Sequence, residues 1–131
     1  MNIPIYRAKK INSNEYIIGY YFYNSNLDEH WITEVSPIQP DDIDYLSIAD
    51  PNWREYEIDI STLAISFNDM LDNQGNKIFA SLSEDGKGGD IAKSKHYTRP
   101  VIYRKGMFSL KDGHLLADDN YLDITVIGIQ Q

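Results

Sequence analysis

The stretch EYEIDISTLAISF, residues 55–67, decides the fold class because apolar residues recur in it at every second position. Over residues 55–60 the apolar side chains fall on one face of an extended chain and the acids fall on the other. This alternation predicts a half-buried β-strand with one face in water. The apolar phase then shifts by one residue, so the sequence predicts a bulge or bend at Ser61-Thr62.

Other short segments rich in aromatic and β-branched residues predict further strands. They are residues 15–23 (EYIIGYYFY, with Gly19 at a bend or close contact), 30–35, 77–82, 99–104, 106–110 and 121–129. DNQGN (72–76) and the segment around Asp112-Gly113 predict hairpin turns, and residues 36–47 predict one helix of about two turns. We therefore expect a mainly β fold, a small barrel or twisted sandwich of short antiparallel strands with one short helix, in a single domain over residues 1–131.

Composition restricts the classes of function. The 131 residues include no cysteine, which excludes disulfides, thiolate metal sites and a cysteine nucleophile. No signal peptide and no apolar segment of membrane-spanning length is evident, so a cytoplasmic protein is expected. The net charge of −8 is unevenly distributed: residues 11–85 hold 15 acids and two bases, whereas residues 86–111 hold seven bases and one acid. Such segregation favours contact between opposite charges within or between chains, or contact of the basic stretch with an external anion.

The glycine-rich segment GKGGD (86–90) invites comparison with a phosphate-binding loop. A P-loop requires G-x-x-x-x-G-K-[ST] followed by a helix, and here Lys87 is followed by glycine and by a segment without helical character. We therefore interpret the segment as a turn that reverses the chain before a strand begins at Asp90-Ile91.

No catalytic, metal or cofactor site is expected. The three histidines are dispersed, and the acidic clusters at 41–44 and 117–120 fit a helix start and a turn. Glu55, Glu57 and Asp59 share one strand face, but nothing in the pattern indicates the burial that would tune their pKa values for acid–base catalysis. A binding protein is favoured over an enzyme, and a hydrolase is kept as a third alternative.

The segment KSKHYTRPVIYRK (93–105) is the candidate binding surface. Its candidate residues are Lys93, Lys95, His96, Tyr97, Arg99, Tyr103, Arg104 and Lys105. Cations interleaved with aromatic rings are typical of surfaces that bind single-stranded nucleic acid. The alternative is an ordinary edge strand with its apolar side chains inside and its cations outside.

Ten tyrosines favour contact with protein, because tyrosine combines a large apolar body with a polar tip and is enriched at interfaces. Together with the separated charges, they predict a protein that binds another protein or copies of itself.

The order of these segments resembles the YopX family of phage and prophage proteins. IYRAKK (5–10) resembles the opening of that family, and YEIDISTLAISFNDMLDNQGNKIF (56–79) is the strongest match. GGDI (88–91), PVIYRKGMFSL (100–110) and DITVIGI (123–129) resemble its later strands. The loop over residues 80–90 is longer here than in the family pattern, and it is a candidate site for a partner specific to this branch.

The resemblance implies a phage-derived, mostly β cytoplasmic protein that self-associates, and it supplies no catalytic residues. We therefore expect a non-catalytic binding protein of phage or prophage origin, without a cofactor. Its partner would be itself or a host or phage protein, and the alternative is an accessory protein that binds nucleic acid through residues 93–105.

Overall fold

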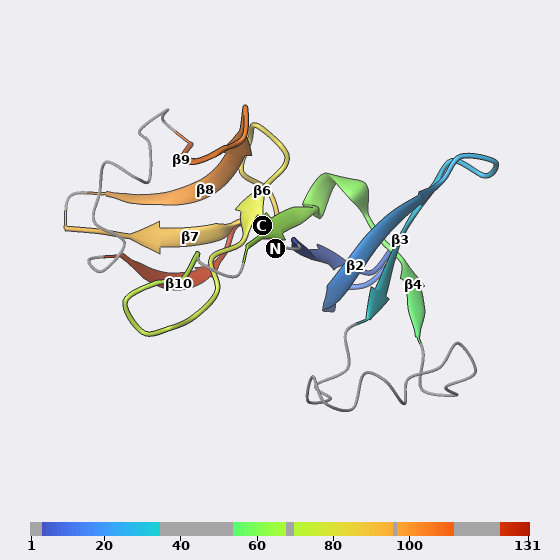
Figure 1. Cartoon of the computed structure of the whole chain (residues 1–131), viewed down its shortest axis with the longest axis horizontal. Helices are drawn as coiled ribbons and strands as arrows, with labels where there is room; N and C mark the ends of the chain where they lie inside the picture. Colours follow the sequence, from blue (N-terminus) through green and yellow to red (C-terminus); the bar gives the residue numbers. More distant parts are fainter. Residues whose placement is uncertain (1–3, 35–53, 68–69, 96, 112–123) are drawn as a thin grey trace.

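The described residues of the computed structural model, 4–34, 54–67, 70–95, 97–111 and 124–131, form a mainly β fold (Figure 1). The strands are β1 (Ile5–Lys9), β2 (Tyr16–Asn24), β3 (Glu29–Glu34), β4 (Glu55–Glu57), β5 (Ala64–Ser66), β6 (Ala80–Ser81), β7 (Asp90–Lys93), β8 (Thr98–Arg104), β9 (Met107–Leu110) and β10 (Thr125–Ile129), and a 3-10 turn, η2 (Ile60–Thr62), precedes β5. The prediction of a mainly β chain is confirmed. The helix expected at 36–47 and the turn expected at 112–113 lie outside the described residues.

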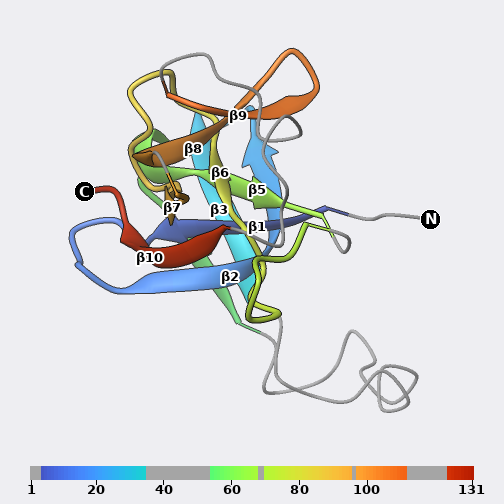
Figure 2. The same ribbon diagram turned by 90° about the vertical axis from the view of Figure 1, so that its left-hand side faces the viewer.

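The strands form one sheet in the order β10-β7-β8-β6-β5-β1-β2-β3-β4, with β9 paired to β8. Neighbouring strands are antiparallel, except that β6 and β8 run parallel where Ser81 pairs with Ile102. The sheet curls strongly into a half-barrel (Figure 2). Where the chain leaves β1, the Ile11 N–H donates to the Glu57 carbonyl at 3.0 Å, so this end of β1 also contacts β4.

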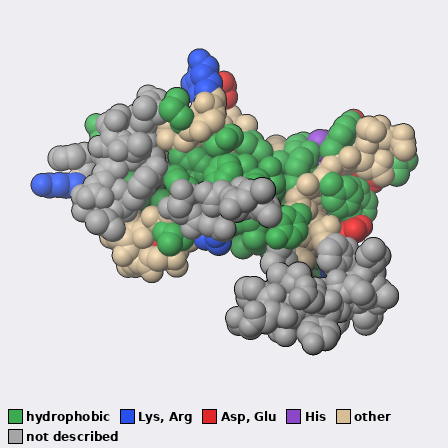
Figure 3. Space-filling view, in the orientation of Figure 1, with side chains coloured by type: hydrophobic (Ala, Val, Ile, Leu, Met, Phe, Trp, Pro, Cys, Tyr) green, Lys and Arg blue, Asp and Glu red, His purple; other side chains and the backbone are tan. Residues whose placement is uncertain are grey.

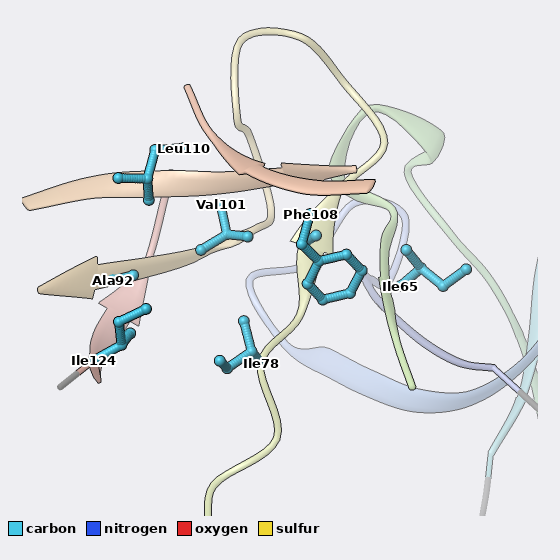
Figure 4. Close-up of a cluster of buried hydrophobic side chains, with 8 residues drawn as sticks. Ile65, Ile78, Ala92, Val101, Phe108, Leu110 and Ile124 are labelled. Atoms are coloured by element: carbon cyan, nitrogen blue, oxygen red, sulfur yellow. The ribbon is translucent and has the colours of Figure 1, made fainter. Parts of the chain in front are cut away.

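Two clusters of buried side chains form the core, one in each half of the sheet. The first lies between β5 and β10 (Figure 4) and consists of Ile65, Ile78, Ala80, Ala92, Val101, Phe108, Leu110 and Ile124. The second lies within β1–β4 and continues after β4, and it consists of Ala8, Ile17, Ile32, Ile58 and Leu63. Tyr6 packs against both clusters, so β1 connects the two halves.

The shift in apolar phase after β4 is a 3-10 turn, which confirms the bend predicted at Ser61-Thr62. The Asp59 carboxylate accepts the Ser61 N–H at 3.0 Å and so caps the turn. The hydroxyl of buried Thr62 accepts the Lys9 N–H at 2.9 Å, which holds the turn against β1. One detail of the prediction was wrong: Ile60 is 43% exposed, because the strand ends before it and the turn directs its side chain outward.

The segment GKGGD is a turn, as predicted, and β7 begins at Asp90. Its adjacent glycines are required by close backbone approach. A Cβ on Gly88, whose φ is +83°, would lie 2.0 Å from the Thr62 carbonyl oxygen, and one on Gly89 would lie 2.5 Å from the Val101 carbonyl oxygen. The turn therefore wedges between η2, β6 and β8 at a place where no side chain fits.

A buried ion pair fastens β1 to this turn. The Arg7 guanidinium donates from Nη2 to the Gly88 carbonyl and to Asp90 Oδ1, each at 2.8 Å. The other Asp90 oxygen accepts the Phe79 N–H at 2.8 Å, and the Arg7 guanidinium carbon lies 4.6 Å from the centre of the Phe79 ring. Burial raises the pKa of Asp90, while the Arg7 charge and the Phe79 N–H oppose that rise.

The hairpin turn at residues 72–76 is organised by the buried carboxylate of Asp72. It accepts the backbone N–H groups of Gln74, Asn76 and Val126 at 2.8–3.0 Å. Burial alone would raise the pKa of Asp72, but these hydrogen bonds outweigh it and lower the pKa. The turn predicted from DNQGN is confirmed, and the bond to Val126 attaches it to β10.

Three glycine-to-alanine substitutions separate the effect of close contact from that of backbone conformation. Gly88→Ala should lower the free energy of unfolding by about 3 kcal/mol or more, because the Thr62 backbone cannot move aside. Gly75→Ala, with φ +83° but open space around it, should cost only about 1–2 kcal/mol. Gly128→Ala, with neither constraint, should be neutral within about 1 kcal/mol. Urea unfolding of the three variants measures these losses of free energy of unfolding. Equal losses for Gly75→Ala and Gly88→Ala would contradict the close contact between Gly88 and the Thr62 backbone.

Candidate protein-binding surface

The basic segment 93–105 runs through the end of β7, a turn and the whole of β8. The turn is closed by the Ser94 N–H, which donates to the Tyr97 carbonyl at 2.8 Å, and by the Tyr97 N–H, which donates to the Ser94 hydroxyl at 3.1 Å. His96 lies outside the described residues. The segment therefore folds back on itself and presents different residues on its two faces.

The two tyrosines of this segment are partly buried against the core. Tyr97 and Tyr103 pack against the first cluster. The Tyr103 ring lies edge-on to Phe108, with ring centres 5.7 Å apart, and 6.0 Å from the Phe67 ring. A partly buried ring packed in this way has only part of its surface left for a nucleic-acid base, which disfavours the two tyrosines as a stacking surface.

The cations of the segment are exposed, but they do not share one face. Lys93, Lys95, Arg99, Arg104 and Lys105 are all exposed. Within the described part of the chain, no ion pair joins any of these five residues to an acid of residues 11–85. Strand alternation places Arg99 on the side of the sheet that carries Val101, and Arg104 on the opposite side.

One small depression adjoins this region. It has a volume of about 460 Å³ and is lined by Thr98, Arg99, Pro100 and Lys111. It brings one cation from β8 next to a cation that follows β9. Its walls contain no aromatic ring, so it is a shallow basic depression and not a groove for a base.

An exposed aromatic surface lies on β2 and β3 instead. Ile18, Tyr20 and Phe22 alternate along β2 on one face and are 40%, 51% and 38% exposed. Trp31 of β3 pairs with Phe22 across the strands, and their rings stack with centres 6.5 Å apart. We call these four residues the aromatic face.

The opposite side of the same two strands explains why the aromatic face is left exposed. Ile17 is buried in the second core cluster, and the Cβ of any residue at Gly19 would collide with the Thr33 carbonyl oxygen at 1.8 Å. The close contact predicted for Gly19 is thus confirmed. Because this side of β2 supplies the core contacts, the other side must point outward.

Acidic residues border the aromatic face. Cross-strand pairing and alternation place Glu29 and Thr33 of β3 on the same face as Trp31. Glu57 of β4 pairs directly with Trp31, and Glu55 pairs with Thr33. An apolar, aromatic strip thus lies beside a row of carboxylates.

On the core side, the tip of the β2–β3 hairpin is held by a polar cluster around His30. The Tyr21 hydroxyl and His30 Nδ1 are hydrogen-bonded at 2.6 Å, and the Tyr23 ring stacks on His30 with centres 4.7 Å apart. The Tyr23 hydroxyl donates to Asp28 at 2.7 Å, and this bond raises the pKa of Tyr23. These contacts stiffen the hairpin that carries the aromatic face.

Sequence reasoning singled out the tyrosines as a group but missed the aromatic face itself. In the segment 15–23 nearly every residue is apolar, so there is no alternation that distinguishes an inner from an outer side. The available signal was the contrast with residues 55–60, where polar residues occupy the outer side. A strand apolar on both sides needs a second covering surface.

Neither a metal-binding cluster nor a membrane-spanning helix is found among the described residues. Among them, no group of three or more His, Asp or Glu side chains could hold a metal ion. Within the same residues, no helix has the length and apolar character needed to cross a bilayer.

Comparison with known proteins found no matching family model, curated protein or solved structure.

The burial of Tyr103 can be tested against the exposure of its neighbour Arg104. Tyr103→Ala should lower the free energy of unfolding by about 2–4 kcal/mol, because it removes a ring packed on Phe67 and Phe108. Arg104→Ala should change it by no more than about 0.5 kcal/mol. Urea denaturation of both variants provides the measurement. A Tyr103 variant as stable as the Arg104 variant would mean that the ring is free for another role.

Proposed function

We propose that this chain is a non-catalytic binding protein of phage or prophage origin that engages protein through its aromatic face. Its partner is a host or phage protein, or another copy of the chain, and its place of action is the bacterial cytoplasm. The observation that carries the proposal is the exposure of Ile18, Tyr20 and Phe22 beside the stacked ring of Trp31.

This surface has the composition of the central part of a protein interface. Aromatic residues, tyrosine and tryptophan above all, dominate the energetics of such interfaces, because they bury a large area with few rotatable bonds. Apolar side chains grouped together on an exposed face commonly mark an interaction site, whereas single exposed ones need no explanation. The four residues of the aromatic face come from adjacent strands and lie side by side.

The resemblance to the YopX family supports the phage origin. Two of the segments that carry it, 5–10 and 88–91, meet in space through the bond between Arg7 and Asp90. The other matched polar residues serve turns: Asp59 caps η2, and Asp72 organises the hairpin turn. Their roles are structural, in keeping with a family pattern that specifies a fold and no catalytic site.

The distribution of charge supports self-association as one use of the surface. Residues 1–67 include 11 acids and four bases, whereas residues 68–131 include nine acids and eight bases, and seven of those eight bases lie within residues 86–111. Figure 3 shows acidic side chains at the β2–β4 end and lysine and arginine side chains at the β7–β9 end. Complementary ends allow one copy to attract another, an effect that salt weakens.

Nucleic-acid binding is the second candidate function. The exposure of Lys93, Lys95, Arg99, Arg104 and Lys105 favours it, since such cations can contact phosphates. The partial burial of Tyr97 and Tyr103 against the core disfavours it. The two candidate functions therefore use opposite ends of the molecule, which makes them separable by mutation.

Capture of partners from a lysate of a bacterial host, with and without nuclease, tests the proposal. We expect the tagged chain to enrich specific proteins whether or not nuclease is present. A Tyr20→Ser/Phe22→Ser variant should lose them, because both side chains are exposed and belong to the aromatic face. An Arg104→Gln/Lys105→Gln variant is the matched control at the basic end and should retain them.

Two results would overturn the proposed function in favour of the second candidate. One is enrichment that disappears with nuclease, and the other is loss of partners in the Arg104→Gln/Lys105→Gln variant alone. Urea unfolding of each variant shows whether it remains folded, and light scattering of the purified chain shows whether it self-associates.

A further inference from the structure

The aromatic face is built to receive an extended chain. Tyr20 and Phe22 are two positions apart on β2, and Trp31 lies across from Phe22 on β3. Side chains at alternate positions of a strand repeat about every 7 Å, which is also the repeat of one face of an extended partner. A partner strand can therefore place one side chain against Tyr20 and the next one on the same side against Phe22, beside Trp31.

The rings favour positive charge. The face of an aromatic ring attracts a lysine or arginine cation. The same chain already contains four such contacts: Lys10 Nζ lies 3.9 Å from the centre of the Tyr56 ring, Arg7 lies over Phe79, and Arg7 and Lys9 both lie over Tyr16. Tyrosine, phenylalanine and tryptophan on the aromatic face offer the same interaction to a cation from outside.

The bordering carboxylates select the same sign of charge. Glu29 and Glu57 lie on the face that carries Trp31, and Glu57 is paired with Trp31 across the strands. They repel nucleic-acid phosphates and acidic peptides and attract cations on the β3–β4 side of the face, whereas Lys9 of β1 lies on its other side over Tyr16. Charge complementarity therefore favours a cationic partner that binds over β2–β4.

We propose that the aromatic face binds an extended protein segment that bears lysine or arginine at alternate positions, with its cations against the rings and beside Glu29 and Glu57. This inference rests on the proposed function and specifies the chemistry of the partner.

The test uses the full chain and three labelled nonapeptides that alternate threonine with lysine, glutamate or serine. Fluorescence anisotropy at about 50 mM salt should show binding of the lysine peptide alone. Its Kd should rise about tenfold or more at 300 mM salt, because the contact is electrostatic and exposed. It should rise about tenfold in Phe22→Ser and about fivefold or more in Glu29→Gln/Glu57→Gln. The Arg104→Gln/Lys105→Gln control should leave it unchanged.

Equal binding of the serine and lysine peptides would overturn the inference, as would an unchanged Kd in Glu29→Gln/Glu57→Gln. That double variant keeps every side chain close to its native size, so it remains a valid test if Phe22→Ser fails to fold. If no peptide binds, the inference also fails, while lysate capture that depends on Tyr20 and Phe22 would still uphold the proposed function. If no peptide binds and lysate capture does not depend on Tyr20 and Phe22, both the inference and the proposed function are rejected.

Discussion

The rest of the structure depends on the buried bond between Arg7 and Asp90. The side chains of these residues are only 9% and 2% exposed, so each charge has left water and is stabilised chiefly by the other. Arg7 also donates to Gly88, and Asp90 accepts from Phe79. One ion pair thereby ties the first strand to the glycine turn and to β7, although 83 positions of sequence separate the two residues. Replacing one partner alone would leave an uncompensated buried charge, which is why this pair matters more than the partly exposed pair of Lys10 and Glu15.

This arrangement also separates the two surfaces that bear on function. The curled sheet places the β2–β3 hairpin at one end of the molecule and β7–β9 at the other (Figure 1). Packing decides which side chains each end can offer to a partner. Tyr103 is partly buried against the core, whereas Tyr20 and Phe22 are exposed. Among the described residues, the basic end therefore offers exposed cations beside partly buried rings, and the acidic end combines exposed rings with carboxylates. Recognition of protein is the chemistry that the second combination suits best.

Much of the fold could be predicted from the sequence, because its signals are local. Alternation over residues 55–60 predicted a strand, the phase shift predicted the turn at Ser61-Thr62, and asparagine and glycine predicted the turn at 72–76. The pairing of Arg7 with Asp90 could not be predicted, since it depends on which distant strands become neighbours. Which tyrosines face outward could not be predicted for a similar reason. Tyr97 and Tyr103 stand beside cations in the sequence, but whether a tyrosine faces inward is decided by partners such as Phe108 on another strand.

A double-mutant cycle on Arg7 and Asp90 measures how far the stability of the fold depends on the pairing of these two buried charges. The variants are Arg7→Met, Asp90→Leu and the combination, each measured by urea unfolding at neutral pH, with Lys10→Met as the partly exposed control. We predict a loss of about 3–5 kcal/mol for either single variant and a double variant that regains much of that loss, because no unpaired charge then remains buried. Lys10→Met should cost about 1 kcal/mol or less. Two results together would contradict the role given to this ion pair. One is that each single variant loses no more free energy of unfolding than the control, and the other is that the two losses simply add in the double variant.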